Sequence, residues 1–284
     1  MDGFILVDKE KDITSFSLVN KIKKNLNLDK TGHSGTLDPN ATGLMIVATN
    51  RATRLLKLLE YDEKEYIATI VFGLNSDTLD VKGNILDDIS MNFNLNELKE
   101  ACEKLKKEET QIPPMTSAIK IDGKKLYEYQ RENKQVEIKP RNVKLIDYEI
   151  LNELHLVDNH LEIDIRLKVS KGYYIRSFAR DLGKLLNGYA ILKDLRRISV
   201  GNFSINDAKK IQELSISDII PIEKFLKLPK VEVKPYLINM IKNGIVLDER
   251  QTNLKEPFFV VNNNEILAIY EPKEDNKYKA VYIF

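Results

Sequence analysis

The stretch Gly32-His33-Ser34-Gly35-Thr36-Leu37-Asp38-Pro39 places one carboxylate, that of Asp38, inside a loop with two glycines and a closing proline. Glycine permits backbone conformations that other residues resist, and proline fixes φ and cannot continue the interior of a helix or strand. The apolar run over residues 41–48 predicts a strand directly after the loop. Such a strand would hold Asp38 on rigid structure, where functional groups are well placed. Asp-Pro pairs also form ordinary turns. The loop by itself therefore makes Asp38 only a candidate for a side chain that faces a ligand.

Residues 1–230 mix strand-like and helix-like patterns without a regular β-α-β-α order, which favours an α+β fold over a doubly wound one. Residues 161–169 alternate strictly between apolar and polar side chains, as a half-buried strand does. The patterns predict strands over 4–7, 66–72 and 161–169, a helix capped by Thr14 or Ser15, a second helix capped by Asn50, and a third with Ile175, Phe178, Ala179, Leu182 and Leu185 on its inner face.

The proline-rich stretch over residues 221–235 is the best candidate for a domain boundary. We therefore expect one domain over residues 1–230 and a small one over 231–284. The second contains three short strand-like runs, at residues 257–262, 266–270 and 279–284.

Charge is unevenly distributed along the chain, although the formal net charge of its 284 residues is only +1. Residues 166–197 hold nine Lys or Arg against two Asp or Glu, and residues 120–144 hold eight against four. Residues 77–103 show the reverse, with seven acidic residues and two lysines. A chain polarised in this way can present a basic face to phosphates despite its overall neutrality.

The remaining composition argues for a protein of a reducing compartment. A single cysteine, Cys102, excludes an internal disulfide framework, and its position among leucines predicts burial on a helix. No run is apolar enough to span a membrane, and the N-terminus lacks the pattern of a signal peptide. His155 and His160 show no metal-ligand spacing. We expect a cytoplasmic protein.

Several motifs occur in the order found in one enzyme family. The Gly32–Asp38 run, followed by Ala41-Thr42-Gly43-Leu44, resembles the catalytic motif of pseudouridine synthases, and most closely the TruB family, which modifies uridine 55 in the T-arm of tRNA. The similarity spans residues 3–208. The other matching motifs are, in chain order, Lys9 with Thr14-Ser15, Lys64-Glu65-Tyr66, Ser76–Asp80, Ile112-Pro113-Pro114, Ser117–Lys120, Gly123–Tyr129, Val169–Arg176, Asp181-Leu182-Gly183 and Leu195-Arg196-Arg197.

The chain departs from the family pattern at three positions, none of which is Asp38. Glu10 stands where proline is usual, Thr116 where an aromatic residue is common, and Tyr173 where threonine is usual. These departures affect the expected loop conformation and the expected substrate binding. They leave the expected chemistry unchanged.

The resemblance implies a mixed, mainly antiparallel central sheet flanked by helices, with a small PUA-like RNA-binding domain at the C-terminus. It implies that Asp38 is the nucleophile in the isomerisation of uridine to pseudouridine, and that Arg176 lies against it. A guanidinium beside a buried carboxylate keeps that carboxylate ionised and fixes its orientation. Tyr66 is implied to stack on the flipped base, while Tyr174 and Leu195 line the pocket and exclude water. The sequence leaves open which carbon Asp38 attacks and which group removes the proton.

The implied partner is tRNA, bound through its T-arm stem-loop, with no obligatory protein partner, no membrane, no metal and no organic cofactor. The enzyme has to extrude the target uridine, which costs on the order of a few kcal/mol. Phosphate contacts offset this cost without reading sequence. The residues expected to contact RNA are His33, Lys9, Lys120, Lys124, Lys125 and Arg141.

Two other functions fit part of the pattern. An aspartyl-phosphate enzyme usually has a second Asp two residues after the first, and this chain has Asn40 there. A non-catalytic protein that binds and folds tRNA would use the same surface as the enzyme. The joint presence of Asp38, Tyr66 and Arg176 favours catalysis.

Overall fold

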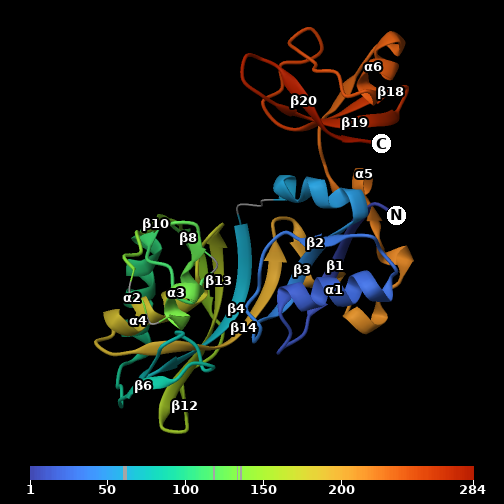
Figure 1. The fold of residues 1–284 in the computed structure, drawn as a ribbon. Helices are drawn as coiled ribbons and strands as arrows, with labels where there is room; N and C mark the ends of the chain where they lie inside the picture. The colour runs from blue at the N-terminus through green and yellow to red at the C-terminus, as the bar shows by residue number, and fades with distance from the viewer. Residues whose placement is uncertain (60–62, 118, 133, 135) are drawn as a thin grey trace.

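The computed structural model describes residues 1–59, 63–117, 119–132, 134 and 136–284. A large mixed sheet has the strand order β11-β13-β4-β14-β3-β1-β16 (Figure 1). Among its described pairings only that of β14 with β3 is parallel, so the expected mainly antiparallel sheet is confirmed. The strands of this sheet are β1 (Gly3–Lys9), β3 (Thr42–Thr49), β4 (Glu63–Phe72), β11 (Leu145–Ile150), β13 (His160–Ser170), β14 (Ala190–Val200) and β16 (Ile220–Pro221), with β2 (Thr31–His33), β12 (His155–Val157) and β15 (Phe203–Ser204) paired beside them.

Apolar clusters cover both faces of the sheet, which explains the continuous apolar run in β3. In β1, Ile5 and Val7 belong to one cluster and Phe4 and Leu6 to the other, because successive side chains of a strand point to opposite faces. Buried side chains of three helices complete the first cluster, and a 3-10 helix contributes to the second. These are α1 (Ser15–Asn25), α2 (Leu95–Lys107) and α4 (Ile175–Leu185) for the first cluster, and η1 (Asn50–Leu59) for the second.

Shorter elements complete the part before residue 230. A helix in this region, α3 (Leu126–Arg131), follows a two-stranded hairpin. The small sheets pair β5 (Leu74–Ser76) with β6 (Ile85–Asp88), β7 (Thr110–Gln111) with β10 (Arg141–Asn142), and β8 (Lys120–Ile121) with β9 (Lys124–Lys125). No helix in the described ranges is long and apolar enough to cross a membrane.

The sequence-based predictions of local structure hold in most elements and fail in two details. Thr14 caps α1, since its Oγ1 accepts a hydrogen bond from the Ser17 amide at 3.0 Å. Asn50 does not cap an α-helix: its Oδ1 accepts from the amides of residues 29 and 30, and it is itself the first residue of the 3-10 helix η1. Leu185 is 38% exposed, because α4 ends there and Leu186 packs on the cluster instead.

Cys102 is buried in α2, as its position among leucines predicted. Burial raises the pKa of its thiol to about 12. The group therefore acts as a small apolar side chain in the core.

The C-terminal sheet has the order β17-β18-β19-β20 and lies apart from the large sheet in Figure 1. The three predicted strands are confirmed. A fourth strand, β17, pairs in parallel with β18 and was not predicted, because it is only three residues long. The elements from residue 222 onward are α5 (Ile222–Phe225), β17 (Lys230–Glu232), η5 (Pro235–Leu237), α6 (Ile238–Lys242), β18 (Phe258–Asn262), β19 (Glu265–Pro272) and β20 (Tyr278–Ile283).

One face of the C-terminal sheet shares an apolar cluster with the rest of the chain. Phe259, Ile269 and Tyr282 belong to the same cluster as Leu55 and Leu59 of η1. Polar contacts reinforce this junction: the Tyr282 hydroxyl donates to the Asp2 carboxylate at 2.6 Å, and Lys57 pairs with Glu271 at 2.6 Å. The C-terminal sheet therefore contributes to the stability of the part before it.

Removal of residues 230–284 is expected to destabilise the remaining chain, because the apolar face of η1 loses its cover. Each large apolar side chain that becomes exposed costs about 1.5–3 kcal/mol. Urea denaturation followed by circular dichroism measures the effect. Tyr282→Phe is the matched control, since it removes only one hydroxyl and costs about 1 kcal/mol. An unchanged unfolding midpoint in the truncated chain would contradict the shared core.

Candidate active site

Asp38 lies in the loop over residues 34–41, between β2 and β3. The strand that follows is anchored by β14, whose Arg197 pairs with Gly43. A Cβ on Gly43 would lie 2.2 Å from the Arg197 carbonyl oxygen, and Gly43 has φ +106, so only glycine fits this approach. The Arg197 side chain is 2% exposed and donates to the carbonyls of Leu44 at 2.7 Å and Gly35 at 3.3 Å. Both ends of the loop are thus tied to β14.

Lys9 is also buried beneath this loop, which corrects its predicted role as an RNA contact. Its side chain is 0% exposed, and its ammonium donates to the carbonyls of Pro39 at 3.0 Å, Ala41 at 2.5 Å and Glu10 at 3.1 Å. Burial lowers the pKa of Lys9 to about 8, while the nearby Asp38 carboxylate opposes this change. An ammonium enclosed by three carbonyls has no surface from which to contact RNA, so Lys9 holds the loop.

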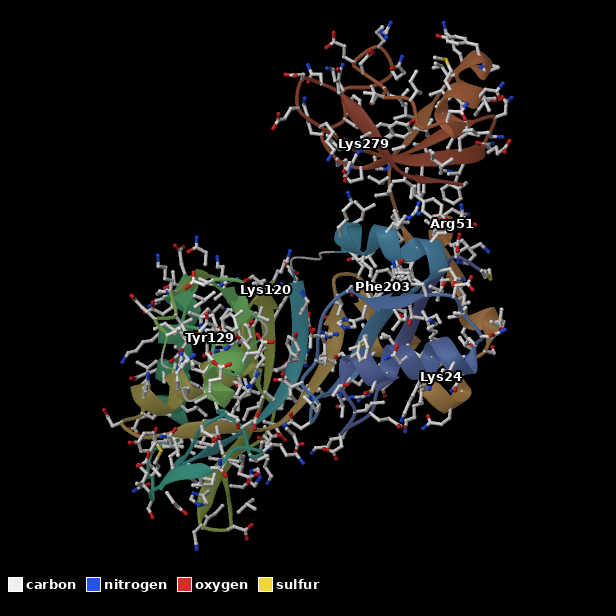
Figure 2. All side chains as sticks on the ribbon, in the orientation of Figure 1. Lys24, Arg51, Lys120, Tyr129, Phe203 and Lys279 are labelled. Atoms are coloured by element: carbon white, nitrogen blue, oxygen red, sulfur yellow. The ribbon has the colours of Figure 1, made fainter. Side chains whose placement is uncertain are left out.

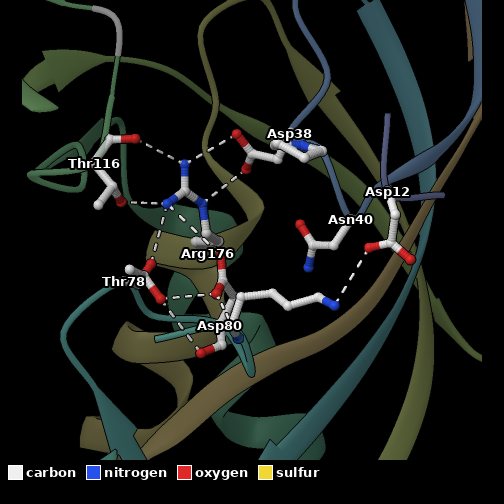
Figure 3. Close-up of a pocket in the computed structure, with 9 residues that line it drawn as sticks. Asp12, Asp38, Asn40, Thr78, Asp80, Thr116 and Arg176 are labelled. Atoms are coloured by element: carbon white, nitrogen blue, oxygen red, sulfur yellow. Dashed lines mark hydrogen bonds and ion pairs between the residues drawn. The ribbon is translucent and has the colours of Figure 1, made fainter. Parts of the chain in front are cut away.

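The Asp38 carboxylate forms an ion pair with Arg176, as the resemblance implied (Figure 3). Arg176 Nε donates to Asp38 Oδ2 at 2.9 Å, and Arg176 Nη2 donates to Asp38 Oδ1 at 3.3 Å. This two-point contact fixes the plane of the carboxylate as well as its position. Arg176 comes from the first turn of α4, so residues 138 positions apart in the chain meet here.

The remaining donors of Arg176 are occupied by backbone and hydroxyl oxygens, so the guanidinium has a single orientation. Nη2 also donates to the Thr116 carbonyl at 3.1 Å, and Nη1 donates to the Thr78 carbonyl at 3.1 Å and to Thr116 Oγ1. Asp80 Oδ2 lies 4.0 Å from Nη1. Arg176 is 6% exposed, and all five of its N–H groups have acceptors within the protein.

The start of α4 is braced in turn. Gly172, with φ +85, allows the chain to turn from β13 into the helix. The Gln111 side chain accepts from the Tyr174 amide at 2.9 Å and donates to the Tyr174 carbonyl at 3.1 Å. The turn at Gly172 and the two bonds from Gln111 therefore hold the N-terminus of the helix that carries Arg176.

Opposing influences act on the ionisation of Asp38. Burial raises the pKa of Asp38 above its ordinary value, the Arg176 guanidinium opposes that rise, and the Asp80 carboxylate adds to it. The Asp38 side chain is still 35% exposed, because it faces an open pocket. Arg176 is therefore the main group that keeps the carboxylate ionised.

The pocket in front of this pair has a volume of about 380 Å³. Its rim carries an ion pair between Lys82 and Asp12, with 3.3 Å between Nζ and Oδ1, and both side chains are exposed. The described lining residues are Asp12, Asp38, Pro39, Asn40, Thr78, Asp80, Lys82, Thr116 and Arg176. Among the described residues no group of three or more His, Cys, Asp or Glu side chains could hold a metal ion.

The predicted pocket residues Tyr66, Tyr174 and Leu195 are not among the described residues that line this pocket. Tyr66 and Leu195 are 8% and 9% exposed, and they belong to the core cluster that also contains Leu37, the neighbour of Asp38. Tyr174 occupies the N-cap position of α4, two residues before Arg176, and burial raises the pKa of its hydroxyl. Tyr66 and Leu195 therefore lie in the core cluster that reaches the Asp38 loop, whereas Tyr174 is half-buried and close enough to Asp38 for that carboxylate to influence its pKa.

The predicted RNA contacts other than Lys9 lie in different environments. His33 is half-buried at the end of β2, its Nδ1 has no hydrogen-bond partner in the described structure, and burial lowers its pKa. Lys120 and Arg141 are exposed, whereas Lys124 pairs with Glu132 and lies 5.0 Å from the centre of the Tyr129 ring. Figure 2 shows Lys120 and Tyr129 on the same half of the molecule. The side chain of Lys125 lies outside the described part of the chain.

The sequence does not predict which residues hold Arg176. Thr78 and Asp80 were identified only as part of a motif that matches the family, and Thr116 only as a position where the chain departs from the family. In the structure the Thr116 hydroxyl accepts from Arg176, a bond that Phe would not make. A signal for this bond is present in the sequence, because Thr116 stands between two of the matching motifs at a position where an aromatic residue is common.

The fold of the chain is similar to that of chains in solved Cbf5 complexes. The crystal structure of a Cbf5-Nop10-Gar1 complex matches with a TM-score of 0.70 at 24% identity, covering 99% of this chain and 84% of that chain. The archaeal box H/ACA sRNP Nop10-Cbf5 complex matches with a TM-score of 0.67 at 22% identity, covering 99% of this chain and 85% of that one. At these identities the similarity establishes the fold.

Sequence comparisons identify the family. The tRNA pseudouridine synthase B of Aster yellows witches'-broom phytoplasma is 40% identical over 287 residues, and that of Acholeplasma laidlawii is 38% identical over 288 residues. Both alignments cover 100% of this chain and 100% of the relative. The model of the TruB family pseudouridylate synthase N-terminal domain matches residues 23–175. The chain therefore belongs to the TruB family of pseudouridylate synthases and is an isomerase.

Proposed function

We propose that this enzyme converts uridine to pseudouridine in the T-arm of tRNA, at position 55, with Asp38 as the nucleophile. The observation that carries the proposal is the two-point ion pair of Asp38 with Arg176 in the pocket of a TruB family chain. The relatives named tRNA pseudouridine synthase B support tRNA as the substrate. A tRNA substrate also supports a cytoplasmic location.

The reaction requires no net redox change. The bond between N1 of uracil and C1′ of ribose breaks, the detached uracil turns, and a bond forms between its C5 and C1′. The proton on C5 leaves and N1 gains one. An ionised Asp38 supplies the nucleophile, whether it attacks the sugar or the ring, and Arg176 holds its carboxylate oriented. The pocket volume of about 380 Å³ lies within the range of about 300–1,000 Å³ typical of ligand sites.

We also propose that the chain divides near residue 230 into a catalytic domain and a PUA-like RNA-binding domain. The separate sheet formed by β17, β18, β19 and β20 supports this division. Tyr66 is the base-stacking side chain in this proposal, and Tyr174 and Leu195 exclude water. Tyr66 and Leu195 share a core cluster with Leu37, the neighbour of Asp38, and Tyr174 is close enough to Asp38 for the carboxylate to influence its pKa; this proximity supports the proposed roles.

Incubation of the purified protein with unmodified tRNA tests the function directly. Pseudouridine is mapped by carbodiimide adducts that stop primer extension. The expected result is one new stop, in the T-arm at position 55. A protein that binds the same tRNA without producing a stop would be the non-catalytic tRNA-folding alternative.

Two exposed cations among the predicted RNA contacts are expected to bind phosphates. Lys120 and Arg141 are exposed, and Arg141 is close enough to Tyr174 to influence its pKa. The double variant Lys120→Ala/Arg141→Ala should reduce the slope of log affinity against log salt by about 0.7–0.9 for each phosphate that these two side chains neutralise. Filter binding across a salt series gives the slope.

The control for this experiment is Lys24→Ala, which removes an exposed charge from α1 on the other half of the sheet (Figure 2). The modified nucleotide should be the same in all variants, since phosphate contacts carry no sequence information. Equal slopes for the double variant and the wild type would show that Lys120 and Arg141 are only solvated.

A further inference from the structure

The hydroxyl of Ser15 lies against the residue that precedes Asp38. Ser15 Oγ donates to the Leu37 carbonyl at 2.9 Å and accepts from the Leu37 amide at 2.9 Å. Ser15 is 3% exposed and Leu37 is 4% exposed, so water does not compete for these two bonds. One side chain thus satisfies both backbone groups of Leu37.

These two bonds fix the backbone that carries Asp38. The amide and the carbonyl of Leu37 belong to the peptide planes on either side of its Cα, and the second plane ends at the Cα of Asp38. Lys9 holds the other flank, through the carbonyls of Pro39 and Ala41. Asp38 therefore projects from a segment that is held before it by Ser15 and after it by Lys9.

The partner of Asp38 cannot compensate for a shift of this segment. Every donor of Arg176 is occupied, and its helix is braced by Gln111. If the loop moves, Arg176 cannot follow it, and the two-point ion pair at 2.9 and 3.3 Å breaks. The alignment of the carboxylate thus depends on the loop.

We propose that Ser15 is a positioning residue for catalysis, which aligns Asp38 with Arg176 through the backbone of Leu37. The inference rests on the proposed function, in which Asp38 is the reacting group. The base from which Ser15 acts is rigid, because Leu18 and Ile22 bury the inner face of α1. Ser15 does not itself cap this helix; Thr14 does.

Ser15→Ala tests the proposal, because it removes both bonds and leaves the rest of the helix intact. The single-turnover rate of pseudouridine formation at saturating enzyme is expected to fall on the order of 10–100-fold, since a misplacement of about 1 Å can cost about 100-fold. The dissociation constant for tRNA should stay within about twofold, because phosphate contacts supply most of the affinity. A purely structural role would leave this rate unchanged in the folded fraction of the protein.

Thr14→Ala is the matched control from the adjacent residue. It removes the helix cap, which costs about 1 kcal/mol of stability, and it leaves the bonds to the loop in place. Its single-turnover rate should equal that of the wild type. Should Ser15→Ala fail to fold, Ser15→Cys fills the site with a slightly larger side chain that is a weaker donor and acceptor, and its rate should fall at least about threefold.

Rates within about twofold of the wild type for both Ser15→Ala and Ser15→Cys would overturn the inference. An equal loss of rate in Thr14→Ala would also overturn it, because the effect would then follow helix stability. A wild-type protein that produces no pseudouridine would instead refute the proposed function, so the two failures are distinguishable.

Discussion

Asp38→Asn is expected to abolish pseudouridine formation, with a rate at least about 1,000-fold below that of the wild type. The amide is nearly isosteric with the carboxylate and keeps the loop in place, but it carries no charge and is not a nucleophile. Affinity for tRNA should persist, because it depends on phosphate and stacking contacts elsewhere. Single-turnover assays with saturating enzyme give the rate, and filter binding gives the affinity.

Mass spectrometry of the purified Asn variant is needed to exclude deamidation back to Asp. Asp29→Asn serves as a control for the removal of one exposed carboxylate outside the site. Substantial turnover by intact Asp38→Asn would refute the assignment of Asp38 as the nucleophile.

Replacement of Arg176 is expected to have the next largest effect. Arg176→Met leaves Asp38 without its cation, and Arg176→Lys keeps the charge but not the two-point ion pair or the bonds to Thr78 and Thr116. We expect the rate to fall about 100-fold or more for the Lys variant and further for the Met variant. Single-turnover rates measured across pH separate misalignment from the removal of charge.

The pH profile should shift in a defined direction. Burial raises the pKa of Asp38, and the Arg176 guanidinium lowers it. In Arg176→Met the second influence is gone, so the pKa of Asp38 rises further. Because the reaction requires the ionised carboxylate, the rate is lost as pH falls through that pKa, and the acid limb should move to higher pH. An acid limb at the wild-type position would contradict the proposed electrostatic role of Arg176.

Much of the fold was predictable because its signals are local. The apolar run over residues 41–48 and the alternation over 161–169 specify strands, and Thr14 provides a recognisable helix cap. The ion pair between Asp38 and Arg176 joins residues 138 positions apart. This ion pair was predicted only from the order of the motifs, because periodicity gives no information on contacts between residues far apart in the chain.

The failed predictions have physical causes that the sequence conceals. Lys9 was expected to contact RNA, but the backbone carbonyls of Glu10, Pro39 and Ala41 enclose its ammonium. Asn50 precedes a run with helical spacing, yet its φ of 47 and its bonds to residues 29 and 30 direct its side chain to another loop. In both cases the partners are backbone atoms, which are the same in every sequence.

A double-variant cycle of Asp38 and Arg176 tests the central claim most directly, which is that the two residues act as one unit. Single-turnover pseudouridine formation is measured for Asp38→Asn, Arg176→Met and the combination of both. Once the nucleophile is gone, Arg176 has nothing to orient, so the combined variant should be no slower than Asp38→Asn. A combined reduction in rate equal to the product of the two single reductions would contradict this account, because it would show that Arg176 acts independently of Asp38.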